Sequence, residues 1–283
     1  MKFLLLFIPL LFIQASLSGQ SYWFNGLTRL PASDGEGTTA NVYFNYQSHS
    51  IDLVRATQLS TNTVFSGEPI RAIEFSGFAV GVEGAWEKKF FALEGGVDLG
   101  ITGTDSDIYD IDDNYLGVAA KIGPMFKYEF KVNDDLSIIP FFRAGFLLEM
   151  ATNDLALLAY SMPTTSAYYN DYNYIPLGST FFNVFANYSI GSSVVWNAWT
   201  AGLELGKYQV IGGDLDLEGV EMPDPLFLRL SFGRKFSSGT LLAGYRIEFW
   251  DTMEYYSNPT YGAMRGEVEW SGHAFDISYQ GAF

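Results

Sequence analysis

Apolar and polar residues alternate with a period of two along most of the chain. In residues 78–86, Phe78, Val80 and Val82 fall on one side, and Glu83 falls on the other among small residues. Successive side chains of a β-strand point to opposite faces, so this pattern predicts strands with one apolar face. The alternating segments are 41–47, 78–86, 91–101, 116–132, 137–150, 180–190, 194–208, 226–236, 240–250 and 263–283.

The connections between these segments alternate between short and long. We expect short turns at 87–89, 133–135, 191–193 and 237–239, and long polar connections at about 49–72, 103–114, 151–178, 209–224 and 251–262. Outer-membrane barrels have short turns on the periplasmic side and long loops outside. The order therefore predicts an all-β, antiparallel, up-and-down transmembrane β-barrel.

The number of strands depends on residues 263–283. Apolar residues occupy even positions at Val268 and Trp270 but odd positions at Phe275 and Ile277. We interpret the segment as one long strand with a bulge at Ser271–His273, because a bulge changes the parity of the outward face. The prediction is ten strands, with eight or twelve as alternatives.

Two prolines and five tryptophans add detail to the predicted barrel. Pro124 and Pro140 fall inside strands and are expected to mark bulges or local breaks in pairing, since proline lacks a backbone N–H. Tryptophans gather in belts at the two membrane interfaces of such barrels. We expect one belt near the short turns, formed by Trp86, Trp196 and Trp199. We expect the other near the long loops, formed by Trp250 and Trp270.

The composition favours contact with a non-aqueous medium. Charged residues make up only 17% of the 283-residue chain, and aromatic residues also reach 17%, with 29 glycines. Gly, Ala and isolated acids opposite the apolar face fit a cramped, polar barrel interior. The net charge of −16 argues against a nucleic-acid partner, which would require a basic surface.

The N-terminus predicts export. Residues 1–19 contain one Lys, an apolar run over 3–13 and then small residues, which is the layout of a secretory signal peptide. A polar lead-in covers 20–38 and the barrel covers 39–283. Cysteine is absent, which excludes a disulfide scaffold and any Cys-based site, and no apolar run is long enough for a helical membrane span.

The last segment carries a family resemblance. With Phe275, Ile277, Tyr279 and Phe283 on alternate positions, it resembles the C-terminal strand of bacterial outer-membrane β-barrel proteins. The resemblance implies an outer-membrane location and implies that these four residues are a signal for the barrel-assembly machinery. It also implies contact with outer-membrane lipid and lipopolysaccharide.

Charged residues of both signs are expected on the inner face of the barrel. They can pair as a structural ion network, or they can form the selectivity lining of a small pore. The lumen-lining candidates are Glu83, Glu94, Asp98, Lys121, Lys127, Arg143, Glu204, Arg229, Arg246, Glu248, Arg265, Glu267 and Glu269.

Three of the expected outer loops have distinctive compositions. Residues 166–174 and 253–259 are rich in Tyr and Asn, which suits recognition of sugars or protein partners as well as packing over the barrel mouth. Another loop is acidic, and its spacing is not that of an EF-hand, so we expect a solvated loop and only a weak candidate for Ca²⁺. Its acids are Asp105, Asp107, Asp110, Asp112 and Asp113.

An enzymatic site is not expected. The chain has two histidines, His49 and His273, and Ser50 follows His49 directly. No Asp-x-His pair is present, and no acid–base set is assembled around either histidine. The expected function is a non-enzymatic barrel without a cofactor, acting as a small passive channel or as a structural membrane protein. A surface-binding barrel that takes a surface ligand through its loops is the alternative, and a hydrolase centred on His49 is less expected.

Overall fold

The computed structural model describes residues 27–32, 36–58, 63–105, 114–152, 180–213, 220–221, 226–249, 253–256 and 264–282. The strands in these residues are β1 (Gly37–Gln58), β2 (Thr63–Glu87), β3 (Phe91–Asp105), β4 (Asn114–Lys127), β5 (Phe130–Lys131), β6 (Leu136–Thr152), β7 (Thr180–Trp196), β8 (Trp199–Gly213), β9 (Val220–Glu221), β10 (Leu226–Lys235), β11 (Thr240–Phe249), β12 (Met253–Tyr256) and β13 (Met264–Ala282).

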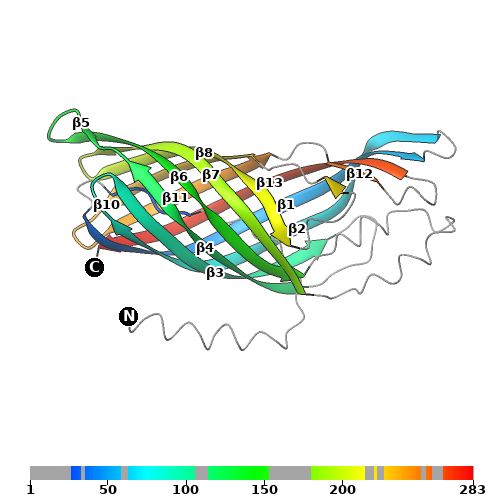
Figure 1. Cartoon of the computed structure of the whole chain (residues 1–283), viewed down its shortest axis with the longest axis horizontal. Helices are drawn as coiled ribbons and strands as arrows, with labels where there is room; N and C mark the ends of the chain where they lie inside the picture. Colours follow the sequence, from blue (N-terminus) through cyan, green and yellow to red (C-terminus); the bar gives the residue numbers. More distant parts are fainter. Residues whose placement is uncertain are drawn as a thin grey trace.

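Ten of these strands form a closed antiparallel ring. Their order is β1-β2-β3-β4-β6-β7-β8-β10-β11-β13, and β13 pairs back with β1. The short strands β5, β9 and β12 pair outside this ring, β5 with β6, and β9 with β12, which joins β13. The predicted ten-strand up-and-down barrel is therefore confirmed. Figure 1 shows the strands running obliquely around the barrel, with β1, β2 and β13 continuing past the other strands at one end.

The outer face of the ring is apolar and the inner face is small or charged. On β2, Phe78 and Val80 are exposed, and Ala79 and Glu83 are buried. In β10 the exposed and buried positions also alternate, from Leu226 to Gly233. A closed ring leaves no unpaired strand edge, which is required of any sheet that crosses a membrane. Among the described residues, no helix is long and apolar enough to cross a membrane.

Two of the predicted connections are wrong. Residues 191–193 do not turn: β7 continues to Trp196, with Ser193 buried and Val194 exposed, so the alternation of faces persists through these small residues. The turn lies at Asn197, whose φ of 54° is the left-handed conformation that Asn tolerates. The expected loop at 49–72 is largely strand, because β1 extends to Gln58 and β2 begins at Thr63.

The predicted single final strand is present, but its bulge is not at Ser271–His273. The pairing of β13 with β11 and with β1 keeps one register through these residues. The irregularity lies on β1 instead, between Leu53 and Arg55. Pro124 does mark a local break: β4 and β6 pair at Ile122 and again at Met125, with no pair between them.

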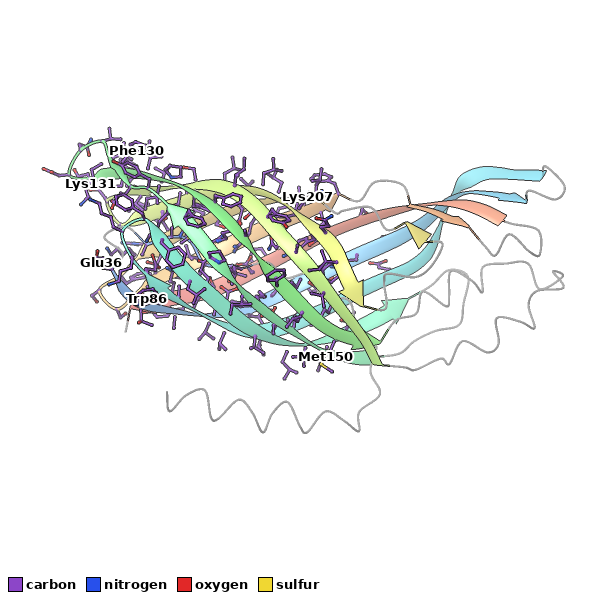
Figure 2. The ribbon with its side chains drawn as sticks, viewed as in Figure 1. Glu36, Trp86, Phe130, Lys131, Met150 and Lys207 are labelled. Carbon is purple, nitrogen blue, oxygen red and sulfur yellow. The ribbon has the colours of Figure 1, made fainter. Side chains whose placement is uncertain are left out.

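Aromatic side chains mark the end of the barrel that carries the short turns, which we call the turn end. Trp86, Trp196 and Trp199 are exposed there, and Arg234 lies 5.3 Å from the ring centre of Trp199. Figure 2 shows Trp86 and Phe130 at this end, with sticks covering the outside of the ribbon. The second expected belt, from Trp250 and Trp270, lies outside the described side chains.

Candidate functional site

Residues 27–32 lie inside the barrel and form the plug segment. Thr28, Arg29 and Leu30 are 4%, 0% and 4% exposed, although none of them belongs to a strand. Ala32 contacts Lys127 at the turn end of β4, and Leu27 contacts Arg229 in the middle of β10. The segment therefore enters from the turn end and reaches the middle of the lumen.

The plug segment carries one cationic side chain, the fully buried guanidinium of Arg29. Its Nη1 donates to Glu94 and its Nη2 donates to Glu87. The same Nη2 donates to the Thr39 hydroxyl at 2.9 Å. Both carboxylates are no more than 1% exposed, so the ion pairs are shielded from water.

Glu83 holds the residue before Arg29. Its Oε1 accepts a hydrogen bond from the backbone N–H of Thr28 at 2.8 Å, and its Oε2 accepts one from the Thr28 hydroxyl at 2.9 Å. Asn41 donates to the same two groups, at 2.8 Å to the Thr28 hydroxyl and at 3.0 Å to Glu83. One carboxylate thus satisfies a backbone group that would otherwise be buried without a partner.

Barrel cations hold the carbonyl groups of the plug segment. Arg229 donates to the carbonyl of Leu27 at 3.0 Å, and Arg143 donates to that of Arg29 at 2.7 Å. Lys127 donates to the carbonyl of Ala32 at 3.2 Å. The carboxylate of Glu83 therefore binds backbone N–H of the segment, and wall cations bind three of its carbonyl groups.

Leu30 is held by an amide and packs against a glycine. The Gln280 side chain accepts from its N–H at 3.3 Å and donates to its carbonyl at 3.0 Å. The side chain of Leu30 lies over Gly202, which leaves the room that a larger inward residue would fill.

The barrel wall adds ion pairs of its own. Arg143 lies 2.9 Å from Glu94 and 2.8 Å from Glu204 and so links β3 to β8. Lys121 lies 2.9 Å from Asp98 and 3.4 Å from Glu83. All of these side chains are buried, so their charges compensate one another inside the lumen.

A further pair lies away from the plug segment. Glu248 lies 2.9 Å from Arg246 and 3.4 Å from Nδ1 of His49. His273 is exposed on the outer face, so the two histidines are on opposite sides of the barrel wall. They cannot act on one substrate.

The structure brings the charged candidates together where it describes them. The buried ones are Glu83, Glu94, Asp98, Lys121, Lys127, Arg143, Glu204, Arg229, Arg246 and Glu248. Arg265, Glu267 and Glu269 belong to β13, but their side chains lie outside the described residues, as do those of Asp105 and the acidic loop. In the assembly strand, Phe275, Ile277 and Tyr279 are exposed, and Phe283 is not described.

Sequence reasoning missed Arg29 and Glu87. Arg29 falls in the expected polar lead-in at 20–38, and Glu87 falls in the expected turn at 87–89. Glu87 is instead the last residue of β2 and points inward with 0% exposure. A signal did exist, since its parity matches that of Ala85 and Glu83 on the same strand.

Little free space remains beside the plug segment. Cavities of about 10 and 20 Å³ adjoin Leu27, one next to Arg229 and the other next to Arg143. A buried water needs about 10–15 Å³, so each holds one water molecule or so. A larger cavity of about 90 Å³ adjoins Leu30, Pro31 and Ala32 toward the turn end. Within the described residues, the free space beside the plug segment is therefore larger toward the turn end than beside Leu27.

No protein-family model matches the chain, and no curated protein matches it in sequence. Similar solved structures include a Pseudomonas aeruginosa FadL homologue at 11% identity, covering 87% of this chain and 90% of that chain with a TM-score of 0.34. An outer membrane channel from Pseudomonas putida is 12% identical, covering 90% and 100% with a TM-score of 0.38.

The outer membrane protease OmpT from Escherichia coli is 7% identical, covering 91% and 100% with a TM-score of 0.40. These values are too low to transfer an activity to this chain. Its own architecture is decisive for its class: a closed, even-numbered antiparallel ring with an apolar outer face. The chain is a transmembrane β-barrel of the bacterial outer-membrane type, located in the outer membrane, with part of its own N-terminal region inside the lumen.

Proposed function

We propose that the protein is a non-enzymatic barrel that conducts small solutes only when the plug segment leaves the lumen. The observation that carries this proposal is the burial of Thr28, Arg29 and Leu30 inside the lumen, where the cavities beside the segment at Leu27 measure only about 10 and 20 Å³. Among the described residues, the two cavities beside Leu27 have no room for a hydrated solute while the segment is in place.

The way the segment is held supports its release. Residues 27–32 belong to no strand, and their recorded partners in the wall are side chains such as Glu83, Arg143 and Gln280. Side-chain contacts break without opening the backbone ladder of the barrel, whose pairing keeps the ring closed. Release would therefore leave the ring intact and would vacate the volume of six residues.

Conductance in planar bilayers tests the proposal. In one variant, residues 27–32 are replaced by Gly and Ser at the same length. The wild-type protein is expected to show no conductance most of the time, and the variant is expected to show frequent discrete openings. Heat-modifiable gel mobility checks that the variant is folded. A folded variant that stays silent would show that the segment is not the barrier.

A structural barrel without any passage is the second candidate. The observation in its favour is the filling of the lumen by wall side chains themselves, including the buried Phe141, Tyr208 and Phe227. The ion pair of Arg246 with Glu248 also adds charged groups to the filling of the lumen, away from the recorded contacts of the plug segment. Silence of the folded variant would favour this candidate.

The two remaining hypotheses rest on weaker ground. The Tyr- and Asn-rich residues 166–174 lie outside the described residues, so a surface-binding barrel stays a prediction from composition. For a hydrolase, His49 is paired with Glu248, but the adjacent Ser50 has the opposite strand parity. An activity screen of the wild type against a His49→Ala variant would decide that hypothesis, and we expect no activity from either.

A further inference from the structure

The lumen contains a preformed set of oxygen atoms around the Arg29 guanidinium. Glu87 and Glu94 accept from different guanidinium nitrogens, and the Thr39 hydroxyl accepts at 2.9 Å. The two carboxylates come from neighbouring strands, β2 and β3. A planar fork of N–H donors matches two carboxylates at fixed separation far better than a compact ammonium does.

Wall residues hold both carboxylates independently of Arg29. The second oxygen of Glu94 accepts from Nε of Arg143 at 2.9 Å, and the second oxygen of Glu87 accepts from Lys127. Thr39 also donates to Glu87 at 3.2 Å. The acids would therefore keep their positions after Arg29 departs, so the site is preorganised for another guanidinium.

The charge of the wall favours a cation in this place. Among the described buried residues of the wall, eight are acids and five are cations, which leaves three acids in excess. The acids are Glu83, Glu87, Glu94, Asp98, Glu149, Glu204, Glu248 and Asp276, and the cations are Lys121, Lys127, Arg143, Arg229 and Arg246. A buried excess of one sign is costly, so an arriving cation lowers the free energy of the open barrel.

The site lies close to the turn end of the barrel. The cavity of about 90 Å³ adjoins Leu30, Pro31 and Ala32 on one side and Trp199 of the wall on the other. The wall of this cavity comes from β7, β8, β10, β11 and β13, and Glu87 is the last residue of β2 at the same end of the barrel.

We propose that Glu87, Glu94 and Thr39 form a guanidinium-binding site, filled by Arg29 in the closed barrel and open to small guanidinium compounds when the plug segment leaves. The inference rests on the proposed function, because an external ligand needs the segment to be displaced. Guanidinium compounds are then the class of solute that the opened passage favours.

Chemical rescue tests this site directly. An Arg29→Ala variant lacks the natural guanidinium, and its thermal midpoint is measured by heat-modifiable mobility in millimolar methylguanidinium or methylammonium at equal ionic strength. Methylguanidinium is expected to raise the midpoint at an about tenfold lower concentration than methylammonium. The wild-type midpoint is expected to respond to neither compound, because Arg29 already fills the site.

A second variant locates the effect. Adding Glu94→Gln to Arg29→Ala is expected to abolish the preference for methylguanidinium. Equal responses to the two cations, or a preference that survives Glu94→Gln, would overturn the site. If Arg29→Ala does not fold alone, its refolding yield with each compound gives the same comparison.

The readouts separate this inference from the proposed function. The thermal shift needs no conduction, so a silent barrel that prefers methylguanidinium would keep the site and reject the channel. An Arg29→Ala variant that conducts but shows no preference would keep the channel and reject the site.

Discussion

Leu30 of the plug segment lies directly over Gly202 of β8: a Cβ atom at position 202 would stand 2.5 Å from Cδ2 of Leu30. That distance is far below van der Waals contact, so a side chain at 202 cannot be accommodated while the Leu30 side chain keeps its present position. The absence of a side chain at position 202 of β8 thus makes the space that Leu30 of the plug segment occupies.

Gly202→Val is therefore expected to push the plug segment out and to raise the open probability in planar bilayers. Gly212→Val is the matched control, because Gly212 is on the same strand and has nothing within 4 Å of an added Cβ. The control should conduct like the wild type. Equal conductance of the two variants would mean that Leu30 adapts in place.

Arg143 is expected to be among the most important side chains for stability. It pairs with Glu94 and Glu204 and donates to the carbonyl of Arg29. Arg143→Met leaves two buried carboxylates short of a partner, which should cost about 3–5 kcal/mol of unfolding free energy. Urea unfolding in lipid vesicles measures this.

The matched control is Lys89→Met, which removes an exposed cation at the turn end. It should change the unfolding free energy by less than about 0.5 kcal/mol. A loss below about 1 kcal/mol in Arg143→Met would mean that water enters the lumen and solvates the freed acids.

The position of the membrane can be tested on a single strand and the turn after it. Leu230 lies mid-strand on the outer face of β10 and Phe236 lies just past its turn end, and both are about half exposed. Leu230→Arg should cost about 2–4 kcal/mol in vesicles, and Phe236→Arg should cost about 0–1 kcal/mol. Equal costs would contradict an apolar band centred on the middle of the strands.

Much of the fold could be predicted from alternation, because one face of each strand meets lipid and the other meets a narrow lumen. This single constraint gave the ten strands and the inward position of residues such as Glu83 and Arg143. The prediction of turns was wrong where the residues have the composition of a turn but the backbone continues as a strand. Residues 191–193 have the composition of a turn, yet they continue β7 with Ser193 directed inward.

The plug segment could not be predicted in the same way. Arg29 sits in a stretch without periodicity, so nothing local distinguishes it from a solvated linker. Its role depends on Glu87, Glu94 and Arg143, which are 58 or more positions away along the chain. Only the closure of the ring brings these residues to one level.

A reversible cross-link between the plug segment and the wall tests the central claim most directly. The chain has no cysteine, so Leu30→Cys with Gly202→Cys introduces the only two thiols. Cγ of Leu30 stands 3.5 Å from the Cβ position of residue 202, which is within the reach of a disulfide. Single-channel conductance of this variant is recorded before and after a reductant is added. We predict silence while the disulfide is intact and discrete openings after reduction; the same conductance in both states would contradict a plug that closes the barrel.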